Sequence, residues 1–186
     1  MQEILRGGAR HAAVIFGAVL MAAAVASCSS PPPTREYAIP KDLCGTEISS
    51  TLLEPLLPPG KEIVIRSTSA VDVQRCRLQI DGEVAFSSSV ERRGADVSAR
   101  DVAMSAIGVG PSDTSTDNGR FIYSKTGAVG RIECKSSENS DSSLWVTART
   151  SHASDASDMR QFIEQFAEAV GKTGACHNSL PRQHDH

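Results

Sequence analysis

Residues 73–91, with the sequence VQRCRLQIDGEVAFSSSVE, decide the fold because they predict a β-hairpin. Apolar side chains alternate with polar ones on both sides of Asp81-Gly82: Cys76, Leu78 and Ile80 before it, and Val84, Phe86 and Val90 after it. Alternation with a period of two is typical of a strand that buries one face. Asp-Gly is a common hairpin turn, and a tight turn joins antiparallel strands. The sequence therefore predicts an antiparallel sheet.

The apolar pattern also constrains the loop of this hairpin. A two-residue loop would pair Ile80 with Glu83 and would place the two apolar sets on opposite faces of the sheet. A three-residue loop over residues 81–83 instead pairs Ile80 with Val84. It also pairs Leu78 with Phe86, so the register favours the longer loop.

Further strands are predicted at residues 61–67, 120–124, 128–135 and 144–149, and helices within 46–56 and 96–107. Residues 108–119 are rich in turn formers and predict a mobile loop. The most regular helical pattern is C-terminal, with apolar side chains recurring at Met159, Phe162, Ile163, Phe166 and Val170. Ser154 or Asp155 provides the N-cap and Gly171 follows the last apolar position. Together these elements predict an α+β domain in two layers, with an antiparallel sheet of about five to six strands and this amphipathic helix packed on one face.

The N-terminus carries an export signal. Arg6 and Arg10 precede an uncharged run at residues 12–26, which is about 15 residues long and shorter than the roughly 20 of a membrane-spanning helix. The run ends in Val25-Ala26-Ser27-Cys28, which resembles the lipobox of bacterial lipoproteins. The resemblance implies that a diacylglyceryl group is attached to the Cys28 sulfur and that the chain is cleaved before Cys28. Plain secretion and a retained anchor are the alternatives.

The lipobox and the composition together resemble uncharacterised actinobacterial secreted lipoproteins. Two acyl chains, such as palmitate, suffice for stable anchoring, so the resemblance implies a lipid-anchored protein on the extracytoplasmic face of the cell membrane. The predicted organisation is a signal peptide at 1–27, a Pro-rich tether at 28–42, one α+β domain at 43–176 and a flexible tail at 177–186 that contains histidines.

The five cysteines fit this location. With Cys28 assigned to lipid, Cys44, Cys76, Cys134 and Cys176 remain, and an even number of thiols outside the cytoplasm predicts disulfides. Four cysteines allow three pairings. We favour Cys44–Cys76 and Cys134–Cys176, because each bond then ties a flanking segment to a strand. The long spacings and the absence of a CxxC motif argue against a zinc or redox site.

No common catalytic motif occurs in the chain, neither GxSxG nor HExxH nor a P-loop. We therefore expect a non-catalytic module without a cofactor that binds a ligand, an envelope polymer or another protein. The alternative is an envelope hydrolase that combines dispersed serines with His152. A net charge of −3 excludes a basic nucleic-acid stripe as the default, and we expect a monomer.

The C-terminal tail and a pair of aromatic residues are two further candidate sites, whereas a pair of aspartates in the loop is not. His177, His184, Asp185 and His186 give a second alternative function, weak capture of a transition metal by the tail. Asp113 and Asp117 lack the spacing of a calcium loop. Trp145 and Tyr123 on neighbouring strands form a candidate ligand-binding surface if Trp145 faces outward. A Trp145 side chain that points inward or is covered by a loop is the other possibility.

Overall fold

The structure is a computed structural model that describes residues 34–134 and 141–176. The predicted signal peptide at 1–27, Cys28 and the tail with His177, His184, Asp185 and His186 lie outside the described residues.

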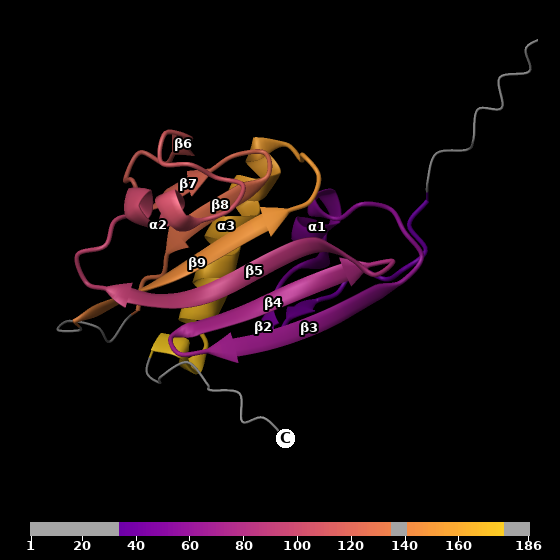
Figure 1. Cartoon of the computed structure of the whole chain (residues 1–186), viewed down its shortest axis with the longest axis horizontal. Helices are drawn as coiled ribbons and strands as arrows, with labels where there is room; N and C mark the ends of the chain where they lie inside the picture. Colours follow the sequence, from indigo (N-terminus) through magenta and orange to yellow (C-terminus); the bar gives the residue numbers. More distant parts are fainter. Residues whose placement is uncertain (1–33, 135–140, 177–186) are drawn as a thin grey trace, which may run out of the picture. The chain divides into compact units, whose positions relative to one another are not determined.

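A seven-stranded antiparallel sheet forms the centre of the domain (Figure 1), in the order β3-β4-β5-β9-β8-β7-β6. Its strands are β3 Ile63–Ala70, β4 Val73–Ile80, β5 Glu83–Gly94, β6 Thr114–Ser115, β7 Phe121–Tyr123, β8 Gly127–Arg131 and β9 Ser142–Thr150. A second sheet pairs β1 Asp42–Leu43 with β2 Thr46–Glu47. The predicted α+β class and antiparallel sheet are confirmed. The extra strand is β6, which lies inside the predicted loop at residues 108–119.

The hairpin of β4 and β5 differs from the prediction in its loop. Ile80 pairs with Glu83, so Asp81 and Gly82 form a two-residue turn, with positive φ angles of 51° and 90°. Leu78 nevertheless pairs with Phe86, as predicted, because a β-bulge leaves Ala85 without a Cα partner. The three-residue loop is therefore wrong. The bulge, and not the turn, brings Phe86 and Val90 to the face of Cys76 and Leu78. Val84 pairs with Gln79 and therefore lies on the opposite face.

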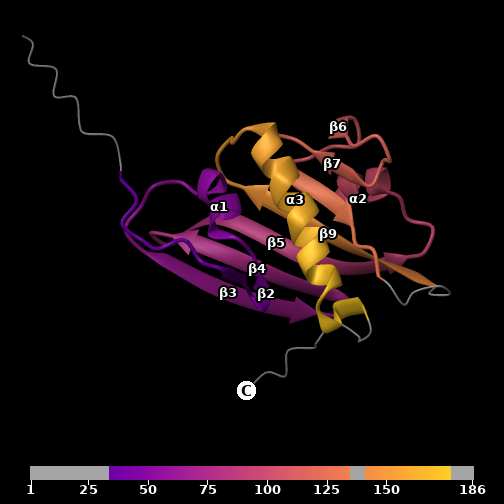
Figure 2. The same ribbon diagram turned by 180° about the vertical axis from the view of Figure 1, so that it is seen from behind.

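One face of the sheet, here called the inner face, packs against α3 Ala156–Gly171 (Figure 2). The α3 stripe is buried, as its periodicity predicts, and the ring of Phe162 lies edge-on to that of Phe86 with centroids 5.1 Å apart. The short helices α1 Ser50–Leu53 and η1 Glu54–Leu56 adjoin α3. Pro55 lies in the first turn of η1, where its missing amide hydrogen is not needed.

The opposite, outer face is only partly covered. Helix α2 Ala99–Ser105 packs on β7 and β8, and its N-terminus carries a capping box between Ser98 and Asp101. Beneath it lies a second apolar cluster that includes Val102, Ala103, Ile122, Val129 and Trp145. Helix α2 therefore adds a partial layer on the outer face, beyond the two layers that the sequence predicts. The outer face of β3, β4 and β5 has no covering helix among the described elements (Figure 1).

Two disulfides, Cys44–Cys76 and Cys134–Cys176, are present, which confirms the favoured pairing. The first ties the turn between β1 and β2 to β4, and the second ties the segment after β8 to η2 Gly174–Cys176.

The domain begins before the predicted boundary at residue 43. Tyr37 is only 8% exposed and belongs to the core. The Arg35 guanidinium donates to the Leu57 carbonyl at 2.6 Å. Residues 35–42, predicted as part of the tether, therefore pack on the domain.

Candidate functional site

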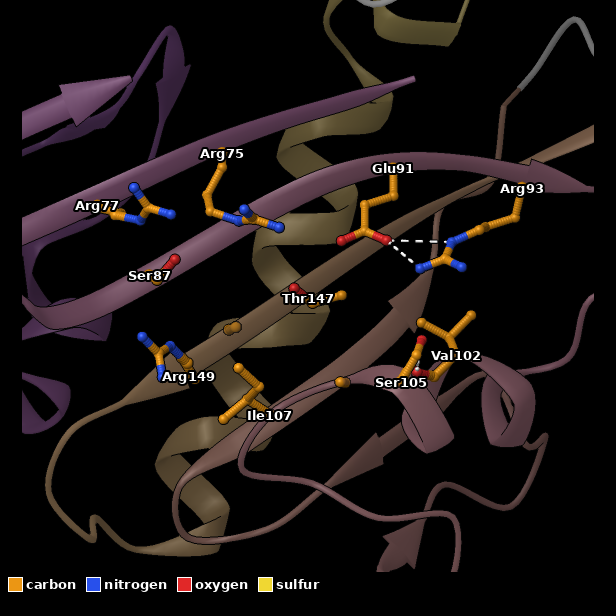
Figure 3. A pocket seen from close by; sticks show the side chains of 12 residues that line it. Arg75, Arg77, Ser87, Glu91, Arg93, Val102, Ser105, Ile107, Thr147 and Arg149 are labelled. Carbon is orange, nitrogen blue, oxygen red and sulfur yellow. Dashed lines mark hydrogen bonds and ion pairs between the residues drawn. The ribbon is translucent and has the colours of Figure 1, made fainter. Parts of the chain in front are cut away.

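A cavity of about 200 Å³ lies on the outer face, where β4, β5 and β9 pass beside α2 (Figure 3). The strands contribute polar and charged side chains, and α2 with the turn after it contributes the facing wall. The lining residues are Arg75, Arg77, Ser87, Glu91, Arg93, Thr147, Ala148 and Arg149 from the strands, and Val102, Ser105, Ala106 and Ile107 from the wall.

Strand alternation and register bring the polar side chains together. Cys76 and Leu78 are buried on the inner face, so Arg75 and Arg77 project from the outer face. Arg77 pairs with Ser87, and Ser87 pairs with Arg149 on the next strand. Two strand spacings, about 10 Å, therefore separate the Cα atoms of Arg77 and Arg149.

The single carboxylate of the lining already has partners. Arg93 Nη2 donates to Glu91 Oε2 at 2.5 Å, and Ser89 Oγ donates to Glu91 Oε1 at 2.7 Å. The Glu91 side chain is only 8% exposed. Removing Arg93 would therefore leave a buried negative charge without its cation, which would destabilise the fold.

The other three arginines, Arg75, Arg77 and Arg149, are half-buried around Ser87 (Figure 3). Their guanidinium groups form no hydrogen bond or ion pair with any residue in the described ranges 34–134 and 141–176. Arg75 and Arg77 lie on β4 and Arg149 lies on β9, with β5 between them. Like charges gathered around one cavity repel one another, so this arrangement does not stabilise the fold. A planar guanidinium binds carboxylate or phosphate oxygens in a bidentate manner. The arrangement therefore suits an anion.

The facing wall is fixed against the sheet. The Gly108 carbonyl accepts hydrogen bonds from Ser124 Oγ at 2.5 Å and from Thr126 Oγ1 at 2.9 Å. Gly127 permits the close approach, because a Cβ atom there would lie 2.8 Å from the Ile107 carbonyl oxygen. Ile107 itself is 66% exposed, so the rim of the cavity is apolar on this side.

The structure does not bring Trp145 and Tyr123 together as a surface. Trp145 does face outward, opposite to Leu144 and Val146, as alternation predicts. However, it is only 1% exposed, because it belongs to the cluster beneath α2. Its Nε1 donates to Ser143 Oγ at 2.8 Å. Tyr123 pairs with Ala128 on the inner face, where the Arg160 guanidinium lies 5.9 Å from its ring.

The other candidate residues lie apart from the cavity. His152 Nδ1 lies 3.0 Å from Thr150 Oγ1, and no serine of the described ranges is bonded to that imidazole. The Asp113 carboxylate accepts from the Gly110 amide within its own turn. Within the described ranges, no group of three or more His, Cys, Asp or Glu side chains could hold a metal ion.

The cavity arginines were missed at the level of sequence. The Arg75-Cys76-Arg77 pattern places both arginines on one face of a strand, but exposed arginines on a strand usually face water. Arg149 joins them only through the register of three strands. No local motif could therefore have identified the cluster.

No known protein family, curated protein or solved structure matches the chain. Within the described ranges no helix is long and apolar enough to cross a membrane.

Proposed function

We propose that the protein is a lipid-anchored, non-catalytic binding module on the extracytoplasmic face of the cell membrane, and that the outer-face cavity binds an anionic group of its ligand. The observation that carries the proposal is that Arg75, Arg77 and Arg149 line one cavity, and that their three guanidinium groups have no partner among the described residues. A phosphate or carboxylate would neutralise them, and Ser87 adds a hydroxyl donor at the same place.

The location rests on the N-terminal sequence together with the disulfides. Val25-Ala26-Ser27-Cys28 has the form of a lipobox, and Cys28 would carry the lipid. Two disulfides support an oxidising compartment. Radioactive palmitate should label the wild type and not Cys28→Ala, and equal labelling of the two would contradict the anchor.

The chemistry of the cavity favours binding over catalysis. A serine nucleophile requires an adjacent general base, whereas Ser87 has arginines as its cross-strand neighbours and Glu91 is held by Arg93 and Ser89. The cavity is smaller than the roughly 300 Å³ at the lower end for drug-sized ligands. It therefore suits one compact anionic group.

Calorimetric titration of the full chain in detergent with inorganic phosphate and with galacturonate tests the proposal. We expect Arg77→Gln and Arg149→Gln each to weaken binding about tenfold or more, since a hydrogen bond to a charged group contributes about 1.5–3 kcal/mol. Binding should also weaken as salt is raised.

Arg160→Gln is the matched control, because Arg160 lies on α3 at the other face of the sheet and pairs with Glu164. It removes the same charge without touching the cavity, so its affinity should stay within about twofold, because a surface ion pair contributes little. Equal losses in all three variants would overturn the site. Hydrolysis of an envelope substrate that depends on His152 would overturn the non-catalytic assignment.

A further inference from the structure

The cavity is one end of a longer row of side chains across the sheet. Arg66 of β3 pairs with Arg77, and the row continues through Ser87 and Arg149 to Gly127 of β8. Since directly paired residues share a face, all of these positions lie on the outer face. Arg66 extends the charge of the cavity to the edge strand of the sheet.

Arg66 is held in place over this face. Its Nε donates to Gln79 Oε1 at 2.9 Å, and its remaining guanidinium nitrogens bind no residue of the described ranges. Arg66 lies directly opposite Arg77, another positive charge without an acidic partner in those ranges. Two positive charges directly opposite each other destabilise the sheet when no ligand is bound. A single anion bound between Arg77 and Arg149 would leave the charge of Arg66 without a counter-ion.

The two ends of the row differ. At Gly127 the row is closed, because the backbone of Gly108 and Ile107 lies directly against that glycine. At β3 the row is open, because no described strand pairs beyond it. Three strand spacings, about 14 Å, separate the Cα atoms of Arg149 and Arg66. A ligand that contacts both arginines must be longer than the cavity.

We infer that the ligand is an extended anionic polymer, of which a terminal unit enters the cavity between Arg77 and Arg149 while the chain leaves across β4 and β3 over Arg66. This inference rests on the proposed function and adds the length and direction of the ligand. Binding from the end follows from the wall at residues 107–108, which prevents the polymer from continuing in the other direction. Phosphate and carboxylate polymers share this chemistry.

Two series of probes, linear phosphates from orthophosphate to chains of several units and galacturonate with its linear oligomers, test the inference on the full chain. In at least one series we expect affinity to rise about tenfold from one unit to a length that reaches Arg66, because one more charged contact contributes about 1.5–3 kcal/mol. Beyond that length it should be constant. The series that shows the rise identifies the anion.

Arg66→Gln should abolish the rise with length and leave the affinity for a single unit within about twofold, whereas Arg149→Gln should weaken every length. Arg160→Gln, which removes a charge from the other face, should preserve the rise. Because only chain ends enter the cavity, the number of proteins bound per long chain should not exceed two, whatever its length. Retained Trp145 fluorescence would show that each variant is folded.

Four results would contradict the inference. An affinity independent of length in both series, with single units still bound through Arg77 and Arg149, would overturn the polymer and leave the anion site. The placement of the polymer over Arg66 would be overturned if Arg160→Gln lost the increase of affinity with length as fully as Arg66→Gln does. Binding from the polymer end would be overturned if the number of proteins bound per polymer grew with its length. If none of the probes bound, the anion site would be overturned as well.

Discussion

Single side chains on the outer face differ in whether their charge is compensated. Arg93 lies against the buried carboxylate of Glu91, whereas Arg77 lies opposite Arg66 with no acidic partner among the described residues. The two arginines are on the same face of adjacent strands, so their effects on folding can be compared directly. One stabilises the fold, and the other opposes it slightly.

We expect Arg77→Gln to raise the free energy of unfolding by about 0.2–1 kcal/mol, because it removes a like-charge pair. Arg93→Gln should lower it by about 1–3 kcal/mol, because Glu91 then remains buried without its cation. Urea denaturation of the two variants measures both values. A loss of stability in Arg77→Gln comparable to that in Arg93→Gln would show that Arg77 has a structural role.

Ser88 provides a second prediction at this scale. Its Oγ is buried on the inner face and has no hydrogen-bond partner among the described residues. Ser88→Ala should therefore raise the free energy of unfolding by about 1 kcal/mol, since an unsatisfied polar group costs about 1–3 kcal/mol. Ser143→Ala is the control, because Ser143 Oγ donates to the Gly94 carbonyl at 2.6 Å. It should lower the stability in the same thermal or urea measurement.

At the scale of elements, local patterns and the two disulfide pairings were predictable, whereas the strand register and the packing of distant elements were not. The stripe of α3 depends on its own period, so Met159 and Val170 were placed correctly. The bulge at Ala85 arises from matching the apolar faces of two strands, which a turn motif does not encode. Trp145 is covered by α2, about 40 positions earlier in the chain, and alternation fixes only the face on which it lies. The arginine cluster requires the register of three strands, so the candidate site could not be predicted.

Helix α2 forms part of the wall of the cavity, and a titratable carboxylate caps its first turn. The Ser98 hydroxyl and amide both donate to the Asp101 carboxylate, which holds the pKa of Asp101 below its ordinary value of 3.8. Because this pKa is lowered in the folded state, the capping interaction is fully present above the ordinary pKa. It is lost as the pH falls through the lowered value.

We therefore expect amide hydrogen exchange in the first turn of α2 to accelerate, relative to the intrinsic rate, as the pH falls below about 4. In Ser98→Ala the same amides should already exchange faster at neutral pH, and the NMR-measured pKa of Asp101 should return toward its ordinary value. An unchanged pKa in Ser98→Ala would contradict the capping role.

For the whole molecule, the two disulfides and the hydrogen-bonded strands of the sheet contribute separately to the stability of the fold. Cys44–Cys76 closes a separation of 32 residues and Cys134–Cys176 one of 42. By the chain-entropy relation each stabilises the fold by up to about 4 kcal/mol. For a domain of ordinary size this is a large part of the total, roughly 5–15 kcal/mol. The bonds hold peripheral segments, while β4 is paired on both sides by β3 and β5.

Because β4 is paired with β3 and β5, we expect the position of its arginines not to depend on the disulfide at Cys76. Cys76 lies between Arg75 and Arg77 in sequence, but its side chain points to the inner face, and backbone pairing with β3 and β5 positions the two arginines. The double variant Cys44→Ser with Cys76→Ser should therefore lose about 2–4 kcal/mol of stability in urea denaturation. Its affinity for phosphate, measured well below the unfolding transition, should stay within about twofold.

The double variant Cys134→Ser with Cys176→Ser is the control for a bond remote from β4. A tenfold loss of affinity confined to the first variant would show that the Cys44–Cys76 bond, and not the strand ladder, sets the geometry of the arginines.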